Sequence, residues 1–132
     1  MEFKRRGSLV MPKNPLNLNF KCKVHEKLYT KNEKKYLDLE LLDPTVKRIE
    51  EVHVASNDFL QKGKLLNPLE GNILKAKIPY RYNRATCKVD GKKLLHDLEK
   101  GDLITVNLEY CGVWQVGDYC GPSWKVIMIV SQ

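Results

Sequence analysis

The segment 73–83, ILKAKIPYRYN, constrains the fold most, because its apolar and polar side chains alternate along its whole length. Alternation with a period of two is typical of a β-strand that buries one face and exposes the other. The side chains expected to face the core are Leu74, Ala76, Ile78, Tyr80 and Tyr82, and those expected to face solvent are Lys75, Lys77, Pro79 and Arg81. Since proline has no backbone N–H, Pro79 is expected at a sheet edge or a bulge. The segment therefore predicts a strand with a basic outer face.

Four further segments have strand patterns. Residues 20–29 alternate apolar with polar side chains, and residues 36–42 place leucines at alternate positions. Residues 103–114 and 123–130 combine alternation with many β-branched and aromatic side chains. Residues 46–55 fit a helix and a strand about equally, and we favour a strand because of their β-branched content. The chain thus offers six short strands.

The remaining segments predict turns, short helices and an N-terminal arm. Short helical turns are expected at 56–63 and 94–102, where a glycine lies at or near the end, with a loop over 64–72. Residues 1–15 have no helix or strand period and predict a flexible basic arm. Residues 16–132 then form a single domain. The pattern predicts an all-β fold, a small antiparallel barrel of five to six strands with one or two short helices.

The composition is that of a folded chain, since hydrophobic residues make up 42% of it. No apolar run approaches the ~20 residues that span a membrane, and the N-terminus has no apolar stretch of signal-peptide length. We therefore expect an intracellular protein, in cytoplasm or nucleus, with reduced cysteines. Cys22 and His25 have the spacing of two metal ligands, but no second such pair follows. Neither a metal nor a cofactor is expected.

Positive charge is concentrated in two blocks. The net charge is +7; residues 1–35 carry +7 and residues 75–93 carry +6, so the rest of the chain sums to −6. Two basic blocks on an otherwise acidic domain indicate a surface that binds a polyanion. The alternative is a solvated face or, for the first dozen residues, a solvated tail.

Both tryptophans lie within residues 110–125, YCGVWQVGDYCGPSWK, between two strand patterns. Trp114 and Tyr119 are expected in a loop, where a buried role is harder to arrange, whereas Trp124 begins an apolar strand and is expected to close one end of the barrel. The three glycines of the segment would let the loop move. This pattern predicts a hinged aromatic loop over a basic groove.

Two motifs carry a resemblance to a known family. Residues 98–108, LEKGDLITVNL, resemble the Lys-Gly-Asp-x-hydrophobic-x-Val entry into a strand of many OB-fold proteins. Residues 114–126, W-x-x-G-x-Y-x-G-x-S-W-K-V, resemble the last hairpin of OB-like single-stranded-DNA-binding proteins of large DNA viruses and phages, with Cys120 and Pro122 interrupting the pattern. The resemblance implies an OB-like barrel that binds single-stranded DNA with little sequence preference. It also implies a replication assembly and an infected host cell as the setting.

Binding a single strand requires cations along the phosphates and flat side chains for the bases. The residues expected to supply them are Lys21, Lys23, Lys27, Tyr29, Lys75, Lys77, Arg81, Arg84, Trp114, Tyr119, Trp124 and Lys125. If the strands that carry the lysines are neighbours, their charges merge into one stripe. The partner is then single-stranded DNA or RNA.

Other functions find less support. No phosphate loop, nucleophile elbow or zinc-protease motif is present, and the side chains of His25-Glu26 point to opposite faces of a strand, so no catalytic residue is expected. No helix is long and basic enough for a major groove. The main alternative is a protein-interaction module, or a subunit of a homo-oligomer, whose aromatic loop contacts a partner protein.

Overall fold

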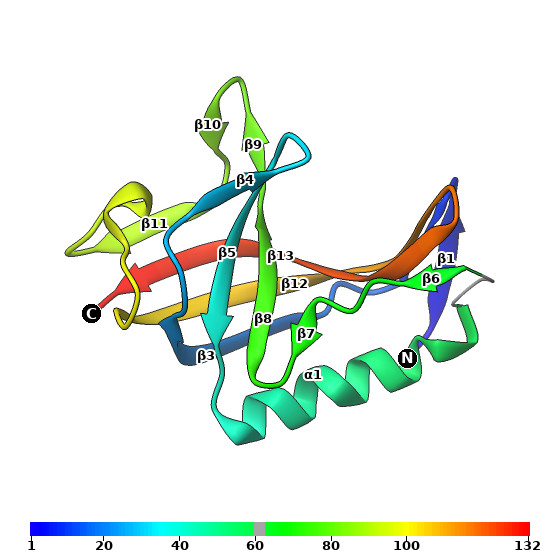
Figure 1. Cartoon of the computed structure of the whole chain (residues 1–132). Helices are drawn as coiled ribbons and strands as arrows, with labels where there is room; N and C mark the ends of the chain where they lie inside the picture. The colour runs from blue at the N-terminus through cyan, green and yellow to red at the C-terminus, as the bar shows by residue number, and fades with distance from the viewer. Residues whose placement is uncertain (60–62) are drawn as a thin grey trace.

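The computed structural model describes residues 1–59 and 63–132, which form an eleven-stranded mixed sheet, a separate two-stranded hairpin and one α-helix (Figure 1). Strands make up 55% of the chain, so the predicted all-β fold is confirmed in part, as a mostly β fold with one helix. The strand pairings show that the sheet is not antiparallel throughout, which corrects that part of the prediction. One edge of the last strand receives three strands in parallel, at three successive places along its length.

Five strands close into a ring. In the order of their pairing they are β3 (Asn17–Val24), β5 (Lys34–Glu40), β8 (Ile73–Ile78), β13 (Tyr119–Ser131) and β12 (Leu103–Val116), and β12 pairs again with β3. Four of the five pairings are antiparallel. The fifth, between β8 and β13, is parallel and consists of the single register position Lys77–Lys125.

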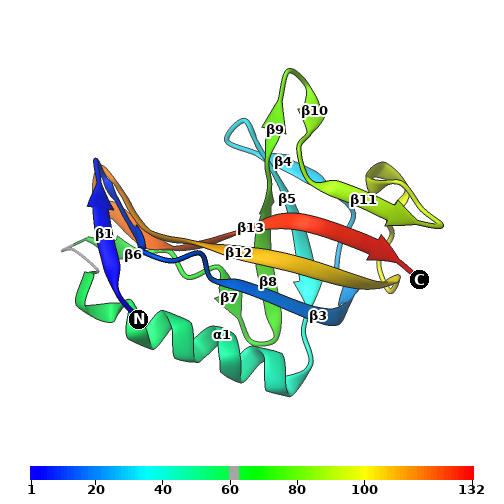
Figure 2. The ribbon, with the colours of Figure 1, turned by 180° about the vertical axis from the view of Figure 1, so that it is seen from behind.

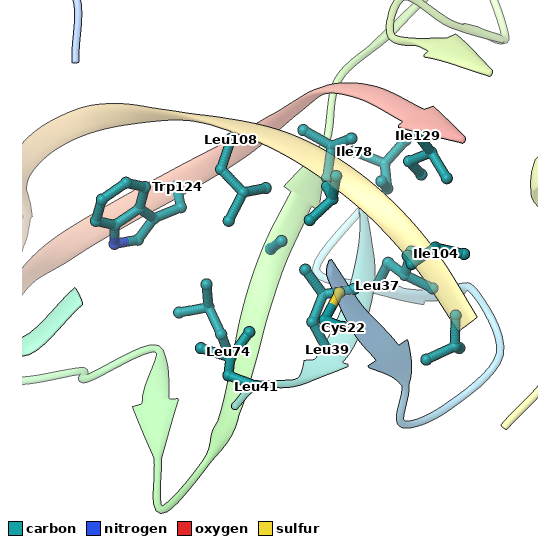
Figure 3. Packing of buried hydrophobic residues seen from close by; sticks show 14 of the residues in the cluster. Cys22, Leu37, Leu39, Leu41, Leu74, Ile78, Ile104, Leu108, Trp124 and Ile129 are labelled. Atoms are coloured by element: carbon teal, nitrogen blue, oxygen red, sulfur yellow. The ribbon is translucent and has the colours of Figure 1, made fainter. Parts of the chain in front are cut away.

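The ring encloses the hydrophobic core. Leu74, Ala76 and Ile78 are at most 1% exposed, as their alternation with lysines predicts. Leucines of the neighbouring strand β5 and of β12 belong to the same cluster, and Figure 3 shows these side chains converging on the interior of the ring. Trp124 lies at one end of this cluster and is 1% exposed. The core therefore fixes which face of each ring strand points outward.

The helix α1 (Asp43–Ala55) replaces the strand expected at 46–55, so that prediction is wrong. Pro44 lies in the first turn of the helix, where its missing N–H costs nothing, and Asp43 places a carboxylate at the positive end of the helix dipole. Ile49 and Val52, three residues apart, are buried, so the apolar spacing follows a helical period. The helix lies along one end of the ring (Figures 1 and 2).

The hairpin of β12 and β13 extends beyond the ring, as Figures 1 and 2 show. A β-bulge between Tyr110 and Gly112 marks where it leaves, and its outer part pairs with β2 (Leu9–Pro12) and β6 (Lys64–Leu65). We call this outer part, together with β2, β6 and the edge strand β1 (Phe3–Arg6), the wing. Two expectations therefore change: residues 1–15 contain paired strands, and most of the aromatic loop expected between 103–114 and 123–130 belongs to the hairpin strands. Residues 3–12 form a paired hairpin, and the loop shrinks to a two-residue turn at Gly117–Asp118.

Two of the three glycines that suggested a moving loop have another role. Gly112 has a φ of +104°, and a Cβ there would collide with the backbone carbonyl of Val10. A Cβ on Gly121 would collide with the carbonyl of Leu66. These glycines let β2 and the segment after β6 approach the hairpin closely, which holds the wing together.

The remaining elements are short. They are β4 (Tyr29–Lys31), β7 (Leu69–Glu70), β9 (Tyr80–Arg81), β10 (Arg84–Ala85), β11 (Lys88–Gly91), and the 3₁₀ turns η1 (Asn57–Phe59) and η2 (Leu95–Asp97). The two turns confirm the expected helical segments, although residues 60–62 lie outside the described residues. The loop expected at 64–72 contains β6 and β7. β8 ends at Ile78, before Pro79, and Tyr82 is 86% exposed, so its expected place in the core is wrong.

Candidate nucleic-acid interface

The outward sides of β4, β5 and β8 carry lysines and two tyrosines. We call this surface the basic–aromatic face, and it consists of Tyr29, Lys31, Lys34, Tyr36, Lys75 and Lys77. Strand pairing places Tyr29 opposite Tyr36, with ring centroids 5.9 Å apart. The Tyr29 hydroxyl donates a hydrogen bond of 2.7 Å to the Asp38 carboxylate, which fixes the ring in place. The two tyrosine side chains therefore form a positioned aromatic pair on the outer surface of the five-strand ring.

The lysines of this face lie close to the rings and to one another. Lys75 Nζ lies 5.6 Å from the Tyr36 ring centroid, and Lys77 is the cross-strand neighbour of Tyr36. Partial burial, followed by the charge of Lys31, lowers the pKa of Lys75. Partial burial and then the charge of Lys34 lower the pKa of Lys77. An anion placed among these ammonium groups would offset the repulsion between the lysines, where Asp38, the cross-strand partner of Lys75, already supplies one negative charge.

Lys125 extends the positive charge across the seam of the ring. It is the register partner of Lys77, and its charge also lowers the pKa of Lys77. Its own ammonium forms a 3.0 Å salt bridge with Glu109. Lys125 therefore contributes less free positive charge than the lysines of β8.

The structure brings together four of the residues expected from sequence: Tyr29, Lys75, Lys77 and Lys125. Sequence reasoning missed Lys31, Lys34 and Tyr36. The signal for Tyr36 was present, because it alternates with the buried Leu37 and Leu39 and must therefore face outward.

Lys21 and Lys23 do not join this face, because β3 is not a neighbour of β8 and the condition for one continuous stripe is not met. Both are exposed on β3, but β5 lies between β3 and β8. Lys23 is instead the register partner of Glu40, and Lys21 that of Thr105. The strand β5, with Glu40 opposite Lys23, therefore separates these lysines from those of β8.

The other expected cations and aromatics also lie elsewhere. Lys27 is exposed in the connection between β3 and β4. Arg81 and Arg84 lie on the separate β9–β10 hairpin, and Trp114 and Tyr119 lie on the wing. Trp114 and Tyr119 therefore do not converge with β8 on one groove, which corrects that expectation, whereas the hairpin of Arg81 and Arg84 follows β8 directly after Pro79.

Trp124 is a core residue, and its expected role as a base-stacking residue is wrong. Its indole is 1% exposed, and its ring centroid lies 4.7 Å from that of Tyr110. The indole N–H donates a 3.0 Å hydrogen bond to His53 Nε2 on α1. The Tyr110 hydroxyl lies 2.7 Å from Ser56 Oγ, just after the same helix. These two polar contacts join α1 and the residue after it to the ring. The Trp124 side chain closes one end of the ring, as the sequence suggested.

This contact predicts a loss of stability in mild acid. Burial lowers the pKa of His53 from 6.5 to about 4. Protonation at Nε2 would also remove the acceptor of the Trp124 hydrogen bond. Between pH 6.5 and about pH 4, His53 is protonated in the unfolded chain but neutral in the folded chain. The free energy of unfolding therefore decreases as the pH is lowered through this range. We expect His53 to account for about 2 kcal/mol of this loss, since its imidazole is only partly buried.

Urea unfolding at pH 7 and pH 4.5 measures the effect, with His53→Gln as the comparison. The glutamine can accept the indole hydrogen bond without titrating in this range. Its pH dependence should therefore be shallower than that of the native chain. Equal pH dependence in the two proteins would contradict the assignment.

Within residues 1–59 and 63–132, no group of three or more His, Cys, Asp or Glu side chains could hold a metal ion. In the same described ranges, no helix has the length and apolar character needed to cross a membrane. The chain matches no protein-family model, no curated protein and no solved structure.

Proposed function

We propose that this chain binds single-stranded nucleic acid, DNA in the first instance, on the basic–aromatic face and with little sequence specificity. The observation that carries the proposal is the pair of tyrosine rings, 5.9 Å apart, among the lysines of three adjacent strands. Tyrosines can stack on unpaired bases, and lysines can neutralise the phosphates between them. Stacking of this kind tolerates every base, since each has a flat π-face.

The ring supports the same proposal at the level of fold. OB folds are small five-stranded barrels that bind oligonucleotides on the face of their second and third strands. Here β5 and β8 are the second and third ring strands in chain order, and both contribute to the basic–aromatic face. We therefore propose an OB-like ring, with a binding face in the position that OB folds use.

A titration with labelled oligonucleotides tests the proposal. A fluorescently labelled oligo-dT of about 16 nucleotides should raise its anisotropy on binding, and the affinity should fall steeply with salt. A duplex of equal length should bind more weakly, because its bases are not available for stacking. Intrinsic tryptophan fluorescence is a poor reporter, since Trp124 is buried and Trp114 lies on the wing. Absence of oligo-dT binding at low salt would refute the proposal.

One observation favours protein interaction as a second candidate. Four large apolar side chains near the tip of the wing, Leu65, Leu66, Val116 and Tyr119, are between 44% and 66% exposed. Exposed apolar residues gathered in this way are typical of protein interfaces. Light scattering over a concentration series tests for self-association, and Val116→Asp should abolish any oligomer that uses the tip. A monomer at every concentration would exclude self-association through this surface.

A further inference from the structure

The β9–β10 hairpin exposes an aromatic side chain at a strained turn. Tyr82 and Asn83 connect the two strands, with φ angles of +54° and +63°, so both are left-handed. Asparagine and glycine accept this conformation readily, but tyrosine does so at a cost. Tyr82 is also 86% exposed, so little packing offsets that cost.

The hairpin also pairs like charges. Arg81 and Arg84 are direct register partners on the two strands, an arrangement that destabilises an isolated hairpin. Neither forms a salt bridge within the part of the chain that the structure describes. The Arg81 guanidinium carbon lies 5.4 Å from the Tyr82 ring centroid, so the cation lies over the ring. This six-residue hairpin therefore carries an exposed tyrosine side chain and two guanidinium groups without a carboxylate partner among the described residues.

The hairpin projects from the ring close to the basic–aromatic face. Its first strand follows β8 directly after Pro79, and it lies beside the turn between β4 and β5 in both views (Figures 1 and 2). Lys35 Nζ lies 5.6 Å from the Tyr80 ring centroid, which connects the base of the hairpin to β5. A strand lying along β5 and β8 and extending beyond Ile78 would reach the hairpin next.

We propose that residues 80–85 are a second contact for the same nucleic-acid strand, in which Tyr82 stacks on a base and Arg81 and Arg84 bind a phosphate together. This inference rests on the proposed function and extends it to a longer binding site. A phosphate between the two guanidinium groups removes their repulsion, and a base on the open face of Tyr82 forms a stack with Arg81 on the other face. Binding thus offsets each destabilising feature of the free hairpin.

The inference predicts an effect of oligonucleotide length. In Tyr82→Asn the aromatic ring is lost, while asparagine accepts the left-handed turn better than tyrosine, so the hairpin should keep its fold. An oligo-dT of about four nucleotides, long enough only for the basic–aromatic face, should bind this variant and the native chain equally. An oligo-dT of about 16 nucleotides should bind the variant about 5-fold or more weakly, the least effect expected from losing one stacked base. Tyr82→Phe, which keeps the ring, should bind both lengths as the native chain does.

A reporter placed at the tip gives a second measurement. In Tyr82→Trp, the long oligo-dT should quench the fluorescence of the new tryptophan, and the short one should leave it unchanged. Native affinity of Tyr82→Asn for both lengths, together with an unquenched Tyr82→Trp, would overturn the role of the hairpin while the proposed function stands. Failure of the native chain to bind oligo-dT of either length would instead overturn the proposed function itself, and this inference with it.

Discussion

Replacing Lys75 and Lys77 together with glutamate is expected to weaken binding of a 16-nucleotide oligo-dT by about 100-fold or more at low salt. Both ammonium groups lie on the outward side of β8, beside Tyr36. The change removes two phosphate contacts and places two carboxylates near Asp38, so the face loses most of its attraction for a polyanion. Anisotropy titrations at several salt concentrations provide the measurement.

The salt dependence distinguishes direct contact from general charge. Each phosphate contact contributes about 0.7 to the slope of log K against log salt for a single strand, so the double variant should have a slope shallower by about 1.4. A variant with unchanged slope but weaker binding would have lost something other than phosphate contacts.

A matched control is available on β3. Replacing Lys21 and Lys23 with glutamate changes the net charge by the same amount, but both side chains lie outside the basic–aromatic face. We expect this control to weaken binding only by the few-fold that a change in long-range attraction produces. Equal losses in the two double variants would show that net charge, rather than this face, determines binding. A native affinity in the Lys75/Lys77 variant would place the site elsewhere.

Replacing Trp124 with alanine is expected to lower the free energy of unfolding by about 3–5 kcal/mol. The indole is 1% exposed, packs on Tyr110 and donates a hydrogen bond to His53. Its removal leaves a cavity where α1 meets the ring and an imidazole nitrogen without its donor. Since the free energy of unfolding of small domains is only about 5–15 kcal/mol, this change would remove a large part of it. Urea unfolding followed by circular dichroism measures it.

Trp124→Phe separates this structural role from nucleic-acid contact. Phenylalanine keeps an aromatic ring in the core but cannot donate to His53, so we expect a loss of about 1–3 kcal/mol and native affinity for oligo-dT. A phenylalanine variant that is folded but no longer binds would contradict the assignment of Trp124 to the core. Trp114→Ala on the wing is a control of the same residue type, and its smaller burial predicts a smaller loss of stability.

The sequence predicted the ring strands best where one face of a strand had to be buried. Apolar side chains at alternate positions of β5 and β8 leave only one orientation in which the strand can pack on a core. The outward position of Lys75 and Lys77 follows from that orientation. The outward position of Tyr36 follows from the same alternation, so the sequence alone could have identified this residue.

The predictions failed where alternation was not decisive. Residues 46–55 contain several β-branched side chains, yet Pro44 and the spacing of Ile49 and Val52 suit a helix that packs on the end of the ring. The first twelve residues have little pattern of their own, and they form strands because β2 pairs with the long hairpin at Val113 and Trp114. Tyr82 follows the alternation of its segment, but Pro79 ends the strand before it.

The sequence by itself determined the buried and exposed faces of β5 and β8, because that information lies in neighbouring residues and the two-residue period of a strand. It also determined that the outward face of β8 is basic. Only the tertiary structure decided which basic residues share a surface: it placed β5 between β3 and β8, which separates Lys23 from Lys75, and it buried Trp124 beneath α1. These relations depend on the pairing of segments far apart in the chain, and no local pattern of side chains specifies that pairing.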